Sequence, residues 1–403
     1  MPNENAKRGN PSRRSVIALG WVSFLTDVSS DMIYPLLPAF LTKTLGAGPA
    51  AVGLIEGVAE TTASLTKIGS GIWSDRVRRR KPIVVLGYAI ATIARPLVAF
   101  AHLWSQVLAI RFADRVGKGI RTSPRDALLA DIVPSDRRGR AFGLQRAMDN
   151  AGAVVGPLLA ALLLKLAFVD ERGVFLLAAV PGLGAILVLL IAVPDTPRRT
   201  ETVRAAPAPP GKLPAPFWRV VAIFALFTLA NSTDAFLLLR AQDAGVALWQ
   251  LPLLWSFFHA VKSVTGVPGG ALADRVGRVP AIALGWLVYC ASYAGFAFVS
   301  QPLAVWALFA LYALFFGLTE GSERAFVADL VPEGLRGRAY GTFHAAIGLT
   351  ALPASVIFGL LWKRFGARAA FLTGAAVALA AAVALWTATR EIRRSRPIPA
   401  IAP

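Results

Sequence analysis

Apolar segments of about 20 residues recur along almost the whole of this 403-residue chain. A helix needs about 20 apolar residues to cross the hydrocarbon core of a bilayer. These windows predict twelve membrane-spanning helices, near residues 15–41, 49–72, 82–101, 105–129, 140–164, 173–193, 217–240, 247–271, 280–299, 303–327, 339–362 and 367–389. The expected fold class is therefore an all-α integral membrane protein. The hydrophobic content of 56% excludes an ordinary soluble domain.

The spans fall into two groups of six. We expect a tail at 1–14, a six-helix bundle at 15–193, a Pro-rich linker at 194–216, a second bundle at 217–389 and a tail at 390–403. Most Lys and Arg residues outside the spans lie on the side of the termini and the linker. The positive-inside rule makes this side cytoplasmic, which places a multi-pass protein in a bacterial inner membrane. The same rule explains the net charge of +19 without a nucleic acid partner.

The two halves of the chain repeat each other. Gly71, Asp75 and Arg76 end the second span, and Gly270, Asp274 and Arg275 end the eighth in the same order. The segment ADIVP at 130–134 likewise matches ADLVP at 328–332. Each match falls at the same place in its six-helix half. Internal duplication with a site between the halves is the architecture of many secondary transporters.

These motifs resemble those of the major facilitator superfamily of secondary transporters, over essentially the whole chain. The resemblance implies two pseudo-symmetric six-helix bundles, a monomer that works by alternating access, a small solute and a proton gradient in place of any cofactor. Arg111 corresponds to the arginine on the fourth span of efflux members, and Gly152-x-x-x-Gly156-Pro157 resembles an element of exporters. The further charges after Arg111 are typical of a poorly characterised bacterial branch.

We therefore expect a proton-coupled exporter of a small organic solute that carries negative charge. A proton-coupled importer with the same fold is the alternative. A membrane-embedded enzyme is a third class, but the chain has no nucleotide-binding loop, zinc-ligand spacing or nucleophile–base pattern. Its one cysteine, Cys290, excludes disulfides and thiolate metal sites.

The fourth span is unusually rich in charge. Each charged residue at the centre of a spanning helix costs about 2.5–3.5 kcal/mol on insertion scales, so these side chains must face protein or water. A structural ladder of ion pairs and a charged wall along a solute path both satisfy that requirement. The first-half spans hold eight basic residues against seven acidic ones, and this excess favours binding of an anion. The predicted solute-binding residues are Arg111, Asp114, Arg115, Lys118, Arg146, Asp149 and Lys262.

Asp27 and Asp31 lie four residues apart, on one face of the first span. Two neighbouring carboxylates away from water repel each other, which favours binding of a proton. Pairing with the basic fourth span is the rival interpretation. The predicted proton-coupling residues are Asp27, Asp31, Glu56, Glu60 and Asp234.

The repeated loops predict a breakable cytoplasmic gate. Its residues are Gly71, Asp75 and Arg76, with Gly270, Asp274 and Arg275 in the second half. Arg125–Asp126 and Glu323–Arg324 stand at equivalent places near the ends of the fourth and tenth spans. We interpret both adjacent pairs as structural ion pairs.

Overall fold

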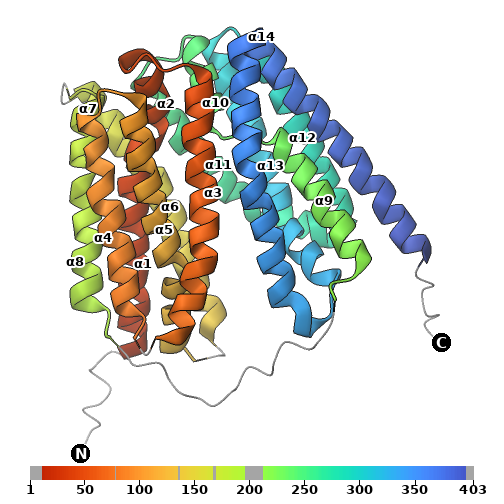
Figure 1. Cartoon of the computed structure of the whole chain (residues 1–403), viewed down its shortest axis with the longest axis horizontal. Helices are drawn as coiled ribbons and strands as arrows, with labels where there is room; N and C mark the ends of the chain where they lie inside the picture. Colours follow the sequence, from red (N-terminus) through yellow and green to blue (C-terminus); the bar gives the residue numbers. More distant parts are fainter. Residues whose placement is uncertain (1–10, 78, 135–136, 167–168, 196–211, 396–403) are drawn as a thin grey trace, which may run out of the picture.

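The computed structural model describes residues 11–395 except 78, 135–136, 167–168 and 196–211. Within these residues the chain forms helices and no strand, which confirms the all-α class (Figure 1). Most of the predicted linker, at 196–211, and the predicted tails at 1–10 and 396–403 lie outside the described residues. The first helix begins at Pro11, before the first predicted span, and the last helix ends at Ser395, after the last predicted span.

The first half forms one bundle of helices (Figure 1). Its helices are α1 (Pro11–Ile33), followed by η2 (Tyr34–Leu36), α2 (Leu37–Ala39) and η3 (Phe40–Thr44), then α3 (Pro49–Arg76), α4 (Lys81–Leu97), η4 (Val98–Phe100), α5 (Trp104–Ile132), α6 (Arg138–Leu166), α7 (Glu171–Leu177) and α8 (Ala179–Ala192). α1 packs against α6 and α8, and α5 packs against α3 and α4. These contacts place α5 between two neighbours and expose one of its faces to the second half.

The second half forms another bundle beside the first (Figure 1). Its helices are α9 (Ala215–Ala230), α10 (Ala235–Asp243), α11 (Gln250–Val276), α12 (Arg278–Phe298), α13 (Pro302–Asp329), η6 (Glu333–Leu335) and α14 (Arg336–Ser395). Gly366 breaks α14 with a φ of 84°, a left-handed conformation that glycine adopts without strain. This break divides α14 close to the predicted boundary between the last two spans.

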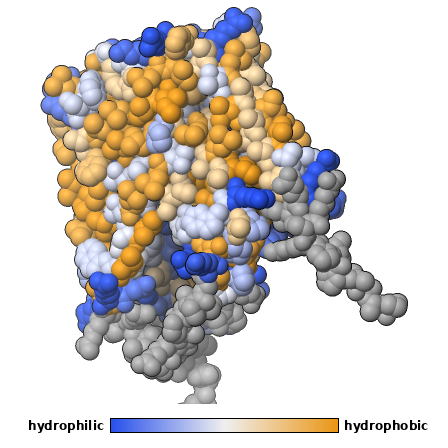
Figure 2. All heavy atoms as spheres, turned by 45° about the vertical axis from the view of Figure 1, so that its right-hand side comes forward, coloured by the Kyte–Doolittle hydropathy of each residue, from blue (hydrophilic) through white to orange (hydrophobic). Residues whose placement is uncertain are grey.

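Among the described residues, eight helical stretches are long and apolar enough to cross a membrane. α3, α5 and α11 are also long enough to cross a membrane, but they are less apolar or more charged than these eight stretches. The two arms of α14 are counted together as one stretch. Figure 2 shows apolar side chains over the flank of the molecule and hydrophilic ones toward its two ends. Ile191 and Leu303 are among the apolar side chains exposed to the surroundings, at 77% and 81%. The protein is thus an integral membrane protein.

The two bundles meet along α3 with α14 and along α6 with α11. In Figure 1, α3 and α14 lie side by side at the end away from the termini and separate toward the termini. Glycine makes the close contact possible: a Cβ on Gly53 would lie 2.2 Å from the Ser355 carbonyl oxygen. Thr61 also donates a hydrogen bond of 2.7 Å to the Gly348 carbonyl. The structure is therefore closed at the end opposite the termini.

We expect Gly53→Leu to separate the bundles at the closed end, because the added side chain would overlap the backbone of α14. Spin labels on cysteines introduced at the exposed positions Lys43 and Arg364 would report the separation by electron–electron double resonance, in a Cys290→Ala background. The measured distance should increase. Gly69→Leu is the matched control, because a Cβ at Gly69 meets nothing within 4 Å. An unchanged distance in Gly53→Leu would contradict this account of closure.

Candidate solute cavity

A cavity of about 570 Å³ lies between the two bundles. α1, α3, α5 and α6 line it from the first half, and the break between α9 and α10 lines it from the second, together with α11, α13 and α14. Its charged lining residues are Asp27, Asp31, Glu56, Glu60, Asp149, Asp234, Arg115, Lys118, Arg121, Arg125, Arg146 and Lys262. Six acids therefore face six bases, so the lining lacks the basic excess expected from the sequence.

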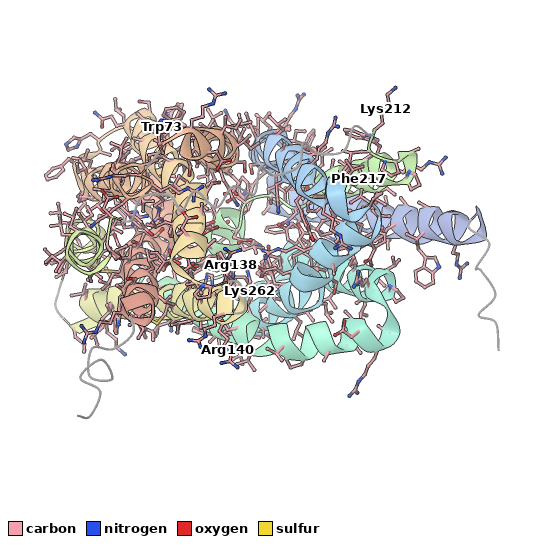
Figure 3. The ribbon with its side chains drawn as sticks, turned by 90° about the horizontal axis from the view of Figure 1, so that it is seen from below. Trp73, Arg138, Arg140, Lys212, Phe217 and Lys262 are labelled. Carbon is pink, nitrogen blue, oxygen red and sulfur yellow. The ribbon has the colours of Figure 1, made fainter. Side chains whose placement is uncertain are left out.

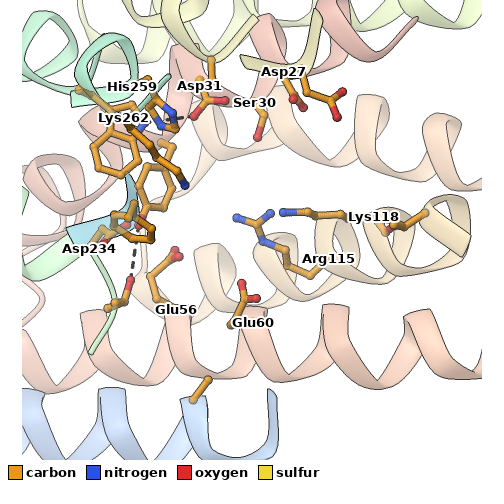
Figure 4. A pocket seen from close by; sticks show the side chains of 18 of the residues that line it. Asp27, Ser30, Asp31, Glu56, Glu60, Arg115, Lys118, Asp234, His259 and Lys262 are labelled. Carbon is orange, nitrogen blue, oxygen red and sulfur yellow. Dashed lines mark hydrogen bonds between the residues drawn. The ribbon is translucent and has the colours of Figure 1, made fainter. Parts of the chain in front are cut away.

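Helical spacing on α5 places basic residues on the cavity. Arg115, Lys118, Arg121 and Arg125 recur every three or four residues and therefore share one face. In Figure 4, Arg115 and Lys118 project into the open space between the acids of α1 and those of α3. Lys118 forms no ion pair with the described residues. The nearest acid to the Arg115 guanidinium is Asp114, at 3.9 Å from Nε.

Arg111 and Asp114 lie behind the cavity wall, contrary to the prediction that they bind solute. Arg111 donates to both carboxylate oxygens of Glu56, with Nη2 at 2.7 Å from each and Nε at 3.0 Å from Oε1. Asp114 accepts a 2.9 Å hydrogen bond from Nε of Arg95 on α4, which also donates to the Thr26 carbonyl. The Arg111, Asp114 and Arg95 side chains are each at most 6% exposed. This network joins α1, α3, α4 and α5, so the structural interpretation holds for this part of the span.

The predicted proton-coupling acids have different surroundings. Asp27, Asp31 and Glu60 line the cavity, where Asp31 accepts a 3.1 Å hydrogen bond from Nε1 of Trp255 across the bundle interface. Asp234 accepts a 2.5 Å bond from the Tyr312 hydroxyl. Glu56 also touches the cavity, but its carboxylate is held by Arg111. Asp27, Asp31 and Glu60 form no ion pair within the described part of the chain.

The remaining predicted solute-binding residues lie nearer the termini. Arg146 and Lys262 line the cavity and both pair with Glu320, and Asp149 lies 3.7 Å from Arg125. Figure 3 views the molecule from the side of the termini and shows Lys262 between the two bundles. The charged wall thus continues from the centre of the molecule toward this side.

The predicted gate residues Asp75, Arg76, Asp274 and Arg275 are exposed in this structure. A Cβ on Gly71 would meet Ser123 of α5 at 3.6 Å, whereas one on Gly270 would meet nothing within 4 Å. The loops are instead held inside their own bundles by arginines not included in the prediction. These ion pairs join Arg80 to Asp75 and Asp131, and Arg278 to Asp329.

The two predicted structural pairs differ from each other. Arg125 lies 3.1 Å from Asp126. The expected Glu323–Arg324 pair is wrong, because Arg324 contacts Glu320 at 3.2 Å, one helical turn away. The Glu323 carboxylate instead accepts from Nε1 of Trp286 at 3.4 Å. Adjacent residues on a helix diverge by about 100°, which favours the partner at i−4.

The predicted site residues did not include Arg95, Trp255 or Glu320. Arg95 and Glu320 each carried a usable signal, since a charge inside an apolar span requires a partner. The contact of Trp255 with Asp31 has no such signal, because the two residues belong to different halves of the chain.

The family model described as Major Facilitator Superfamily matches residues 19–322 and 253–402. The chain belongs to the major facilitator superfamily.

An uncharacterized transporter of this superfamily from Methanocaldococcus jannaschii is 34% identical over 392 residues, which cover 94% of this chain and 97% of that protein. A probable 4-methylmuconolactone transporter from Cupriavidus pinatubonensis is 30% identical over 402 residues, covering 94% and 90%. A bacterial homolog of the human lysosomal transporter Spinster, solved in an inward-facing and unoccupied conformation, has the same fold. The TM-score is 0.80 at 17% identity, over 98% of this chain and 100% of that one.

The cavity of this major facilitator superfamily transporter depends on the ion pairs behind its wall. Arg111→Gln should leave the Glu56 carboxylate buried without its partner, and loss of one member of a buried pair costs about 3–5 kcal/mol. We expect a lower melting temperature in detergent, with part of the loss recovered in the double variant Glu56→Gln/Arg111→Gln. Arg140→Gln, at an exposed position, is the control. Equal melting temperatures for Arg111→Gln and Arg140→Gln would show that the pair does not stabilise the fold.

Proposed function

We propose that this protein is a proton-coupled exporter of a small organic anion, working as a monomer by alternating access without a cofactor. The observation that carries the proposal is the pair of basic residues Arg115 and Lys118, which project into a cavity that also contains Asp27 and Asp31. Arginine offers a planar fork suited to a carboxylate, and lysine adds a point charge. One cavity therefore contains groups for an anion and groups for a proton.

Export is supported by the Gly152-x-x-x-Gly156-Pro157 element on α6. A Cβ at either glycine would lie 2.5 Å from a carbonyl oxygen of α1, Phe24 for Gly152 and Val28 for Gly156. The exporter-like element thus sets the distance between α6 and α1, the helix that carries Asp27 and Asp31. The relative from Cupriavidus pinatubonensis, a probable 4-methylmuconolactone transporter, agrees with a small organic solute.

Import by proton symport is the second candidate. Asp27 and Asp31 line the same cavity as the two cations. A bound anion occupies those cations and adds negative charge beside the carboxylates, which favours uptake of a proton. Solute and proton would then move in the same direction.

Proteoliposomes with an imposed pH gradient distinguish the two candidates, with small carboxylates as the solutes screened. An antiporter concentrates its solute when the lumen is acidic, and a symporter does so when the outside is acidic. Quaternary ammonium compounds of similar size serve as the comparison. Accumulation driven by an acidic lumen supports export, whereas accumulation only with an acidic bath would replace export by import.

We expect Arg115→Gln to weaken binding of the transported carboxylate by about 1.5–3 kcal/mol, the range for a hydrogen bond to a charged group. Arg115→Lys should recover part of the affinity, because the charge remains while the fork is lost. Isothermal titration calorimetry of the purified protein would measure both. Arg140→Gln should bind as the wild type does. Unaltered affinity in Arg115→Gln would reduce Arg115 to a structural role.

Asp31→Asn should abolish accumulation driven by a pH gradient and preserve exchange of solute across the membrane. Asparagine keeps an oxygen that can accept from Trp255, so the substitution removes the titrating group without removing the contact. Asp27→Asn is measured in parallel, and exchange of radiolabelled solute provides the control for folding. If both variants and their double variant still concentrate solute, coupling belongs to Glu60 or Asp234.

A further inference from the structure

Glu320 is a carboxylate held by three cations from both bundles. Its oxygens contact Arg146 of α6, Lys262 of α11 at 3.3 Å and Arg324 of α13 at 3.2 Å. The contact with Arg146 joins the first bundle to the second, at the side of the cavity that faces the termini. The close contact of Gly53 with Ser355 lies at the closed end, and the contact of Asp31 with Trp255 lies in the cavity.

The side chains of this cluster are partly exposed to solvent. The Arg146 and Arg324 side chains are 56% and 55% exposed, and that of Glu320 is 31% exposed. Such partly exposed ion pairs add little to stability. The buried Arg111–Glu56 pair, with side chains 6% and 7% exposed, is the contrasting structural case. Water, and a solute carboxylate, can therefore reach the cations that hold Glu320.

The cluster also lies on the way to the cavity centre. Counted from the helix ends on the side of the termini, Arg324 lies five residues deep, Arg146 eight and Lys262 fourteen. On α5, Lys118 lies at the same depth as Lys262, fourteen residues, and Arg115 lies at seventeen. Both Arg146 and Lys262 line the same cavity as Lys118 and Arg115. Basic side chains thus line the cavity from its opening toward its centre. The Glu320 carboxylate lies among those nearest the opening.

We propose that Glu320 is a tethered carboxylate that occupies the outer anion site of the solute-free protein, and that an organic anion displaces it from Arg146 and Lys262. The inference rests on the proposed function and adds the outer site and its mode of opening. Displacement breaks the only one of these three contacts that joins the bundles, Arg146–Glu320. An anion entering from this side therefore both binds the site and releases the bundles to move.

The cluster around Glu320 also selects solutes by charge. A cationic solute meets Arg146, Lys262 and Arg324 without being able to replace Glu320, because it offers them no acceptor. An anion gains the contacts that Glu320 gives up. Solutes are thereby sorted by charge before they reach Arg115.

The test uses a small anionic thiol reagent as the probe. Ser30 lines the cavity, so Ser30→Cys in a Cys290→Ala background reports entry. Purified protein in lipid nanodiscs is treated with sulfonatoethyl methanethiosulfonate, and with the cationic trimethylammonioethyl methanethiosulfonate. We expect Glu320→Gln to raise the rate with the anionic reagent at least fivefold, because the amide cannot hold the three cations.

Glu323→Gln is the matched control, since Glu323 lies one turn from Glu320 on α13 and its hydrogen bond with Trp286 stays within the second bundle. The amide keeps an oxygen that can accept from Trp286, so this substitution removes a charge without opening the outer site and should alter the anionic rate less than twofold. The gain from Glu320→Gln should vanish in an Arg146→Gln background, where the outer site is already broken. Equal increases of the anionic labelling rate in both acid-to-amide variants would contradict the proposal that Glu320 occupies the outer site. An increase that persists in the Arg146→Gln background would contradict it as well. Absence of labelling by either reagent would instead contradict the open solute cavity and thus the proposed function.

Discussion

A guanidinium inside a membrane-spanning bundle needs a partner, and the pairing of Arg111 with Glu56 meets that requirement at the centre of this protein. Together with the Arg95–Asp114 pair, it anchors α5 to α3 and α4. The turn of α5 that faces these helices is thereby fixed. Arg115 and Lys118 lie on the same side of α5, one and two turns nearer the termini, where that side borders the cavity and both project among acids. Successive turns of α5 thus carry first buried ion pairs and then basic side chains that line the cavity.

The two bundles have different interiors. The second is filled by large aromatic side chains, with Trp286 stacked on Phe227 at 4.2 Å and Tyr289 on Tyr293 at 4.1 Å. It presents few charges to the cavity, namely Asp234 and Lys262. A rigid, mostly apolar half facing a charged half is suited to movement about a fixed polar site. In the proposed alternating access, the charged wall would stay with the first bundle while the contacts between the bundles change.

The all-α class, the order of the helices and the duplicated halves could be predicted from the sequence, because hydrocarbon imposes length and hydrophobicity on each span. The cavity residues Arg115, Lys118, Asp27 and Asp31 followed from helical spacing. Spacing alone could not separate Arg111 and Asp114 from Arg115, because these residues lie within about one turn and their roles depend on what α3 and α4 place opposite them. Contacts between the halves, such as Trp255–Asp31, depend on packing that no local pattern encodes.

The central claim is that the carboxylate of the solute contacts Arg115 directly. The most direct measurement is a thermodynamic cycle by calorimetry, which compares a transported carboxylate with its uncharged amide in wild type and in Arg115→Gln. Direct contact predicts strong non-additivity: removing the solute charge should weaken binding about tenfold or more in the wild type and only slightly in the variant. Additive losses, with the carboxylate preferred equally by both proteins, would contradict the account and place the anion elsewhere in the cavity.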